Sequence, residues 1–244
     1  MLPVAGRPAL AYLLELCRLH GIAEVAINLH HCPEAIPAAF GDGQMLGLRL
    51  TYSRESVLLG SAGALVPLRP FLDRTFFVLY GDLLTDMDLT AMLAFHRCHG
   101  GLGTVVLYRV PDPQRCGLGE LDAAGRIRRF VEKPPAGQLF TDLVNAGVYL
   151  LEPELLPLLP DQVPYDFGQD FFPLLVAAGV PLYGYLLAPG EYLLDFGTPE
   201  NYARARQEWP SVWANRDREI GDREKGPCEG PAGPSQGPHT APMG

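Results

Sequence analysis

An apolar run of aromatic and aliphatic residues, 76–80, stops abruptly at Gly81 and Asp82 within the stretch TFFVLYGDLLTDMD. A run without alternating polar residues is typical of a strand that is buried on both faces. A carboxylate at the carboxyl end of such a strand lies where open α/β sheets bind ligands, and a glycine before it lets a ligand approach the backbone. We therefore take Asp82 as the first candidate metal ligand. The alternative is a turn aspartate that bonds its own backbone.

Similar patterns along the rest of the chain predict alternating helices and strands in the first half and mostly strands in the second half. Helices are expected between Pro8 and Gly21 and over residues 33–40, 89–98, 154–159, 170–178 and 199–208. Further strands are expected over residues 25–29, 48–53, 103–109, 117–121, 127–132, 143–151, 181–187 and 192–195. This order predicts an α/β fold: a Rossmann-like, mostly parallel mixed sheet flanked by helices, with an added β-rich lobe.

The pattern changes near the carboxyl end of the chain. Residues 215–225 are charged and almost free of apolar side chains, and residues 226–244 are rich in proline and glycine. Such a composition cannot bury enough apolar surface to fold. We therefore expect one folded domain over residues 1–208 and a disordered tail over residues 209–244.

Composition narrows the classes of partner. A formal net charge of −9 argues against nucleic acid, which needs a basic face, and means that an anionic substrate needs a local cation. The five cysteines are scattered, so reduced thiols in the cytoplasm fit better than a disulfide framework. We find neither an apolar run of about 18 residues nor a secretory signal, so no membrane span is expected. The oligomeric state stays open, and a homo-oligomer is compatible with the sequence.

Two aspartates at strand ends form the most informative pair. Asp82 follows one apolar strand, and Asp195 follows the apolar pair Leu193 and Leu194. If the two strands are neighbours, the carboxylates converge, and paired carboxylates with open positions suit Mg²⁺, which takes phosphate oxygens as further ligands. The alternative is two unrelated turn aspartates.

Three further groups offer a positive charge, a gap for a flat ring and a buried amide. Lys133 follows Glu132 at the end of a predicted strand and is held by the proline after it, so it offers a point charge to a phosphate. The alternative is an ordinary solvated lysine at a strand end. The small residues Gly60, Ser61 and Gly63 leave room for a flat ring and expose backbone groups. Asn145 inside an apolar strand needs hydrogen-bond partners, which sugar hydroxyls could supply.

Other candidate sites have simpler explanations. Asp86 and Asp88 match the D-x-D pattern of metal-dependent glycosyltransferases, but Asp88 is a good cap for the helix that follows. His96 and His99 near Cys98 lie at a helix end, where a positive charge is favourable, so this explanation is preferred to a metal site.

Taken in order, these pieces resemble the sugar nucleotidyltransferases, or nucleoside-diphosphate-sugar pyrophosphorylases. The resemblance covers residues 2–205 and is strongest to the mannose-1-phosphate guanylyltransferase and glucose-1-phosphate nucleotidyltransferase branch. The matching stretches are LPVAGRP at 2–8, LGSAGAL at 59–65, YGDLLTDMDL at 80–89, RFVEKP at 129–134, VNAGVYLLEPELL at 144–156 and LDFGTPENYARA at 194–205.

The resemblance implies the reaction and the roles of individual residues. The implied reaction is attack of a sugar 1-phosphate on the α-phosphorus of a nucleoside triphosphate, with release of pyrophosphate. The β-rich lobe would bind the sugar. The implied roles are Mg²⁺ binding by Asp82 and Asp195, contact of Lys133 with the sugar phosphate, a sugar pocket of Gly117, Glu132, Asn145 and Gly147, and a nucleotide site of Gly60, Ser61 and Gly63.

The chain departs from this family at its start. Family members begin with a strand, a glycine-rich G-G-x-G-T-R loop and a lysine before the segment that matches Leu2, and none of these is in the sequence. We expect that the first central strand is missing through truncation or a misplaced start, and that activity without it is reduced. The alternative function is a non-catalytic regulatory homologue that binds a sugar nucleotide.

Overall fold

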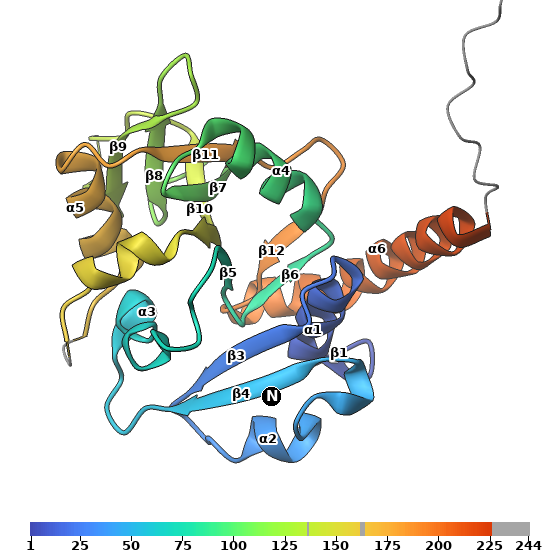
Figure 1. Cartoon of the computed structure of the whole chain (residues 1–244). Helices are drawn as coiled ribbons and strands as arrows, with labels where there is room; N and C mark the ends of the chain where they lie inside the picture. The colour runs from blue at the N-terminus through green and yellow to red at the C-terminus, as the bar shows by residue number, and fades with distance from the viewer. Residues whose placement is uncertain (136, 162–163, 226–244) are drawn as a thin grey trace, which may run out of the picture.

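The computed structural model describes residues 1–135, 137–161 and 164–225, and its main body is a mixed sheet flanked by helices (Figure 1). Six strands form the sheet in the order β11-β7-β10-β8-β9, with β5 paired to β10. Their bounds are β5 Phe76–Leu79, β7 Gly103–Arg109, β8 Gly117–Leu121, β9 Ile127–Glu132, β10 Leu143–Leu151 and β11 Leu182–Leu186. The expected α/β architecture is therefore confirmed.

Outside this sheet, the described part of the chain forms three separate strand pairs, six α-helices and the 3₁₀-helical turns Gln44–Leu46, Val66–Leu68 and Pro153–Leu158. The pairs are β1 Pro3–Val4 with β2 Arg7–Pro8, β3 Glu24–Leu29 with β4 Arg49–Arg54, and β6 Leu83–Thr85 with β12 Leu193–Asp195. The helices are α1 Ala9–Leu19, α2 Ala35–Phe40, α3 Gly60–Gly63, α4 Leu89–His99, α5 Phe172–Ala177 and α6 Pro199–Lys225. A π-helical turn, Phe167–Phe171, leads directly into α5.

Strand β10 separates the two halves of the hydrophobic core. Tyr149 and Leu151 pack into a cluster on one face of the sheet, and Val148 and Leu150 pack into a cluster on the other. Since successive side chains of a strand point to opposite faces, both faces of β10 are buried. This explains its continuous apolar sequence, from which its bounds were predicted correctly.

Strand direction is more mixed than the sequence predicted. β10 runs antiparallel to β5, β7 and β8, whereas β11 is parallel to β7 and β3 is parallel to β4. Alternating strands and helices predict parallel pairs, but β10 follows the hairpin of β8 and β9 without a crossover helix. Its direction is therefore reversed relative to its neighbours.

A slot separates β3 from β5 in the middle of the molecule. In the described residues β3 pairs only with β4 and β5 only with β10, and a cavity of about 1480 Å³ lies between them. The cavity is lined from the two strands by Val25, Ala26, Ile27, Phe77, Val78 and Leu79.

Helix α6 corrects the expected domain boundary after residue 208. It continues to Lys225 and extends away from the body in Figure 1. Trp209 is fully buried and Trp213 is 7% exposed, both packed edge-on against Tyr12 of α1. The expected tail wrongly included Trp209 and Trp213, because the residues that follow them are charged. The expected proline- and glycine-rich tail over residues 226–244 lies outside the described residues.

We predict that Trp209→Ala destabilises the fold by about 3–5 kcal/mol, because it leaves a large cavity under α6. The measurement is the free energy of unfolding from urea denaturation. Gln207→Ala, an exposed position two residues earlier on the same helix, is the control and should change stability by less than about 0.5 kcal/mol. Equal effects for both variants would show that α6 does not anchor the domain.

Candidate functional site

The structure brings Asp82 and Asp195 together, although 112 residues lie between them in the sequence. Strand β12 pairs antiparallel with β6 so that Asp195 lies opposite Leu83, and the N–H of Phe196 donates to the carbonyl of Asp82 at 2.9 Å. A Cβ placed on Gly197 would lie 3.0 Å from Oδ1 of Asp195 and 3.2 Å from Oδ2 of Asp82. Both carboxylates therefore face one point, and Gly197 leaves that point free.

The two carboxylates repel each other. Both residues keep solvent-exposed surface. Partial burial nevertheless raises the pKa of Asp82, and the negative charge of Asp195 raises it further. Asp195 Oδ1 accepts a hydrogen bond from the N–H of Gly197 at 2.7 Å, which fixes its orientation. Within the described residues, no group of three or more His, Cys, Asp and Glu side chains is arranged to hold a metal ion.

Glu132 and Lys133 lie at the end of β9 beside two glycines. The carboxylate of Glu132 fills the space that a Cβ on Gly117 or on Gly168 would need. It lies 3.7 Å from Nζ of Lys133, whose side chain is 63% exposed compared with 18% for Glu132. Burial raises the pKa of Glu132, and the ammonium group of Lys133 lowers it again in part. The glycines thus create a bay that holds a carboxylate next to an accessible cation.

Cys116 shows that this bay and the aspartate pair are neighbours. Burial raises the pKa of its thiol, and the charges of Glu132 and Asp195 raise it further, while Lys133 lowers it. These three charged groups therefore all lie close enough to the thiol to act on it electrostatically. The predicted sugar site and the predicted metal pair share one region of the molecule.

A bulge in β10 explains Asn145 and Gly147. Pairing with β7 shifts register between Asn145 and Tyr149, and Gly147 adopts a left-handed φ of 72°. Asn145 Oδ1 accepts from the N–H of Gly147 at 3.1 Å, and its Nδ2 donates to the hydroxyl of Tyr149 at 2.8 Å. The amide thus has partners within its own strand, so a sugar hydroxyl is not needed to satisfy it.

The segment Gly60, Ser61 and Gly63 forms α3 and packs against residues 165–167. The N–H groups of Ala62 and Gly63 both donate to the carbonyl of Tyr165 at 2.9 Å. These two backbone donors are therefore not free for a ligand, contrary to the expectation of exposed groups. The Ser61 hydroxyl donates to Oδ2 of Asp166 at 2.6 Å.

Sequence reasoning missed Asp166 and Tyr80. Asp166 Oδ1 accepts from the N–H groups of Gly168 and Gln169 and so caps the π-helical turn, while its other oxygen holds Ser61. Gly168 packs against Glu132. The carboxylate of Asp166 therefore positions both the α3 segment and the bay around Glu132. The signal was present: Asp166-Phe-Gly168 repeats Asp195-Phe-Gly197, and both aspartates accept from the N–H two residues on.

Tyr80 connects the α3 segment with the bulge of β10. Its hydroxyl interacts with those of Ser61 and Tyr149, and its N–H donates to the carbonyl of Gly147 at 3.1 Å. It directly precedes Gly81 and Asp82. A tyrosine at the polar end of an apolar strand could have indicated this role, since a buried hydroxyl needs partners.

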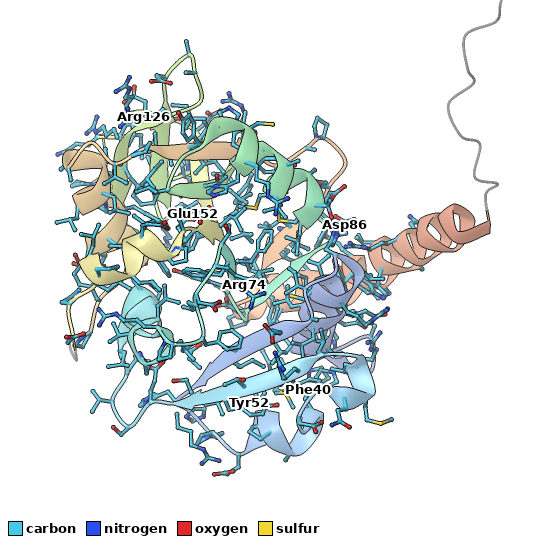
Figure 2. All side chains as sticks on the ribbon, viewed as in Figure 1. Phe40, Tyr52, Arg74, Asp86, Arg126 and Glu152 are labelled. Carbon is cyan, nitrogen blue, oxygen red and sulfur yellow. The ribbon has the colours of Figure 1, made fainter. Side chains whose placement is uncertain are left out.

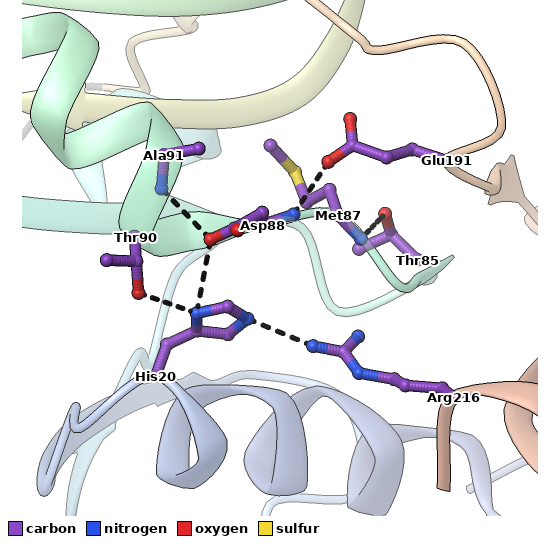
Figure 3. Close-up of polar contacts among 8 residues, drawn as sticks. All are labelled: His20, Thr85, Met87, Asp88, Thr90, Ala91, Glu191 and Arg216. Carbon is purple, nitrogen blue, oxygen red and sulfur yellow. Dashed lines mark hydrogen bonds and ion pairs between the residues drawn. The ribbon is translucent and has the colours of Figure 1, made fainter. Parts of the chain in front are cut away.

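Asp86 and Asp88 have structural partners instead of converging on a common point. Asp86 Oδ1 accepts from the N–H of Tyr192 at 2.6 Å. Asp88 Oδ1 caps α4 by accepting from the N–H of Ala91, and it lies 3.6 Å from Nδ1 of His20 (Figure 3). The cap predicted for Asp88 is confirmed.

The two histidines of α4 also have structural partners. His96 is buried, and its ring contacts the hydroxyl of Thr104 and the carboxylate of Glu152. His99 Nδ1 lies 2.9 Å from the carbonyl oxygen of Phe95.

A family model described as nucleotidyl transferase matches residues 1–211. The chain belongs to the nucleotidyl transferase family.

Curated relatives in this family are named for reactions of sugar 1-phosphates. The UTP–glucose-1-phosphate uridylyltransferase of Synechocystis sp. is 38% identical over 197 residues, which are 75% of this chain and 51% of that protein. The mannose-1-phosphate guanylyltransferase of Mycobacterium tuberculosis is 36% identical over 209 residues, which are 84% of this chain and 56% of that protein. The chain thus spans about half the length of these relatives.

Two solved structures share the fold. A Bacillus anthracis protein described as a glucose-1-phosphate thymidylyltransferase, in complex with sucrose, superposes with a TM-score of 0.74 at 22% identity, covering 84% of each chain. HddC from Yersinia pseudotuberculosis, complexed with GMP-PN, gives a TM-score of 0.72 at 21% identity over 86% of this chain and 88% of HddC. None of the described helices has the length and apolar character to cross a membrane.

We predict that Gly168→Ala destabilises this nucleotidyl transferase by about 1–3 kcal/mol, because the added Cβ would overlap the Glu132 carboxylate. Helix propensity alone would favour alanine by about 0.5–1 kcal/mol, so the sign of the change is diagnostic. Urea denaturation of Gly168→Ala, Glu132→Ala and the double variant should reveal a coupling of about 1 kcal/mol or more.

Gly81→Ala is the control for this cycle, since a Cβ there meets no atom within 4 Å. Additive effects of Gly168→Ala and Glu132→Ala would contradict the described bay.

Proposed function

We propose that this protein is a sugar-1-phosphate nucleotidyltransferase. An oxygen of the sugar phosphate attacks the α-phosphorus of a nucleoside triphosphate, the bond between the α-phosphorus and its bridging oxygen breaks, and pyrophosphate leaves. The observation that supports this most directly is the convergence of Asp82 and Asp195 beside the bay of Glu132 and Lys133. The names of the curated relatives point to the same class of reaction.

The aspartate pair fits Mg²⁺ as cofactor. Its donors are carboxylate oxygens only, they face one point, and their mutual repulsion is relieved by a cation. Two protein carboxylates leave room for phosphate oxygens, as expected of a metal that shares its ligands with the substrate. When bound, Mg²⁺ would offset the charge of the transferred phosphate.

Side chains of the protein would bind and orient the two substrates. Lys133 would bind the sugar phosphate as a point charge, and Glu132 would accept hydrogen bonds from sugar hydroxyls inside the bay. The α3 segment would border the nucleobase, with Gly60 packed on Tyr165 and Ser61 held by Asp166. Asn145 would act by shaping the β10 bulge that sets Gly147 against Tyr80. Catalysis would then come from positioning and charge compensation, without a nucleophilic side chain.

A second candidate is a regulatory homologue that binds a sugar nucleotide without turnover. The observation that favours it is the open slot between β3 and β5, which adjoins Ser61 and Asp82. Pyrophosphate release and nucleotide-sugar binding, measured with a panel of nucleoside triphosphates and sugar 1-phosphates, separate the two. Binding without release selects the regulator, and neither binding nor release contradicts both.

We predict that Asp82→Asn lowers kcat/KM by about 100-fold or more, because a metal ligand contributes several kcal/mol to transition-state stabilisation. The same variant should keep or raise the free energy of unfolding, by up to about 1 kcal/mol, since it removes the repulsion from Asp195. Paramagnetic Mn²⁺ titration gives a readout without turnover and should show weakened binding.

The control for this test is Asp88→Asn, which keeps an acceptor for the α4 cap and should leave kcat/KM within about twofold. If Asp88→Asn abolished Mn²⁺ binding and Asp82→Asn did not, the metal would belong to the D-x-D pair.

We predict that Lys133→Ala raises KM for the sugar 1-phosphate by about 10–100-fold, because a charge-assisted hydrogen bond is worth about 1.5–3 kcal/mol. KM for the nucleoside triphosphate should change by less than about threefold. Arg128→Ala removes an exposed cation of the same strand, paired with Asp122, and serves as the matched control. Equal increases in KM for both variants would indicate a general loss of positive charge in place of a specific contact.

A further inference from the structure

Helix α3 and residues 165–167 form one hydrogen-bonded unit, which we call the α3 unit. The N–H of Tyr165 donates to the carbonyl of Leu59 at 2.8 Å, and the N–H of Phe167 donates to the Ser61 hydroxyl at 2.9 Å. Together with the two bonds from α3 to the carbonyl of Tyr165, these contacts fix the two segments relative to each other. Under the proposed function the α3 unit borders both substrates, because it contains α3 and leads into the π-helical turn beside the sugar bay.

Apolar packing holds the α3 unit on the main sheet. The ring centroids of Phe167 and Tyr149 lie 4.8 Å apart, and Ala62 belongs to the same buried cluster. The hydrophobic effect is non-directional, whereas a hydrogen bond weakens steeply when its angle changes. A polar contact between the α3 unit and the sheet therefore fixes their relative position more sharply than the packing does.

Tyr80 supplies such a contact from the side of the sheet. It directly follows β5, its N–H donates to the carbonyl of Gly147 in β10, and a Cβ on Gly147 would lie 3.1 Å from its ring. The sheet thus holds the backbone and the ring of Tyr80. Its hydroxyl interacts with that of Ser61 in the α3 unit, and Asp82 follows two residues later. Tyr80 therefore joins the α3 unit to the segment that carries the candidate metal ligand.

The hydrogen bonds around this contact run in one direction. A carboxylate only accepts, so the Ser61 hydroxyl gives its single proton to Asp166 and can then only accept from Tyr80. At the other end, the amide of Asn145 donates to the hydroxyl of Tyr149, which interacts with that of Tyr80. Each hydroxyl therefore donates to the next, and the chain ends on a carboxylate. In such a chain each hydrogen bond strengthens its neighbours.

We propose that Tyr80 is a positioning residue, whose hydroxyl fixes the α3 unit relative to Asp82 and so relative to a metal ion held there. The effect on the reaction rests on the proposed function, and the effect on the fold rests on the contacts of Tyr80 alone. A misplacement of about 1 Å can lower a rate by about 100-fold. Loss of this hydroxyl therefore acts mainly on kcat, while the groups that bind each substrate stay in place.

The test is Tyr80→Phe, which removes the hydroxyl and keeps the ring against Gly147. In an assay of pyrophosphate release, kcat should fall by about tenfold or more, with KM for both substrates within about threefold. Hydrogen exchange at the amides of Ala62, Gly63 and Gly168 should become about tenfold faster, because the α3 unit is held less firmly. The exchange measurement needs no turnover.

Two other tyrosines provide matched controls. Tyr149→Phe removes a fully buried hydroxyl from the same chain but leaves the contact of Tyr80 with Ser61. It should lower the midpoint of urea unfolding about as much as Tyr80→Phe does, with a kcat at least about threefold higher than that of Tyr80→Phe. Tyr52 of β4, labelled in Figure 2 apart from the main sheet, donates to the carbonyl of Gly41 at 2.7 Å. Tyr52→Phe should leave kcat and the exchange of the α3 unit unchanged.

Ser61→Ala breaks the same contact from the other side. Combined with Tyr80→Phe, it should lower kcat no further than the more damaging single variant, because both changes remove one interaction. Three outcomes would overturn the proposal: independent losses that multiply in the double variant, unchanged exchange in Tyr80→Phe, or equal losses of kcat in Tyr80→Phe and Tyr149→Phe. If the unmodified chain released no pyrophosphate but exchange responded as expected, the proposed function would fail and the positioning contact would be confirmed.

Discussion

The site depends on the pairing of two short strands, β6 and β12. This antiparallel pair is only three residues long, yet it places Asp195 next to the backbone of Asp82 although 112 residues lie between them in the sequence. The resulting carboxylates face one point and repel each other, which costs stability whenever both are charged. The flanking apolar cluster holds them in place: Leu84 of β6 and Leu194 of β12 pack with Trp209 of α6. The helix whose end the sequence misplaced therefore supports the site directly.

The sequence predicted the strands that local runs and turns mark and missed the features that depend on contacts between distant segments. The bounds of β7, β8, β9 and β10 were correct because continuous apolar runs and a turn-rich junction mark them clearly. The bulge at Asn145 was not predicted, since a single asparagine does not reveal that its own strand satisfies it. Asp166 was missed because its partner Ser61 lies 105 residues away. The extent of α6 was missed because the charged residues around Trp209 and Trp213 make the segment polar on average, although both rings are buried.

The charge balance of the site limits how it can act. Under the proposed function, a chain with a net charge of −9 would bring two phosphorylated substrates next to a pair of carboxylates, and Lys133 is an exposed cation beside the bay. A divalent cation on Asp82 and Asp195 would compensate for part of this charge. Backbone N–H groups are the other source of positive potential, but those of Ala62 and Gly63 are already bonded to Tyr165. The repulsion between Asp82 and Asp195 is therefore the barrier that any phosphorylated ligand meets at this point, and a bound cation is the compensation that a pair of carboxylate donors fits.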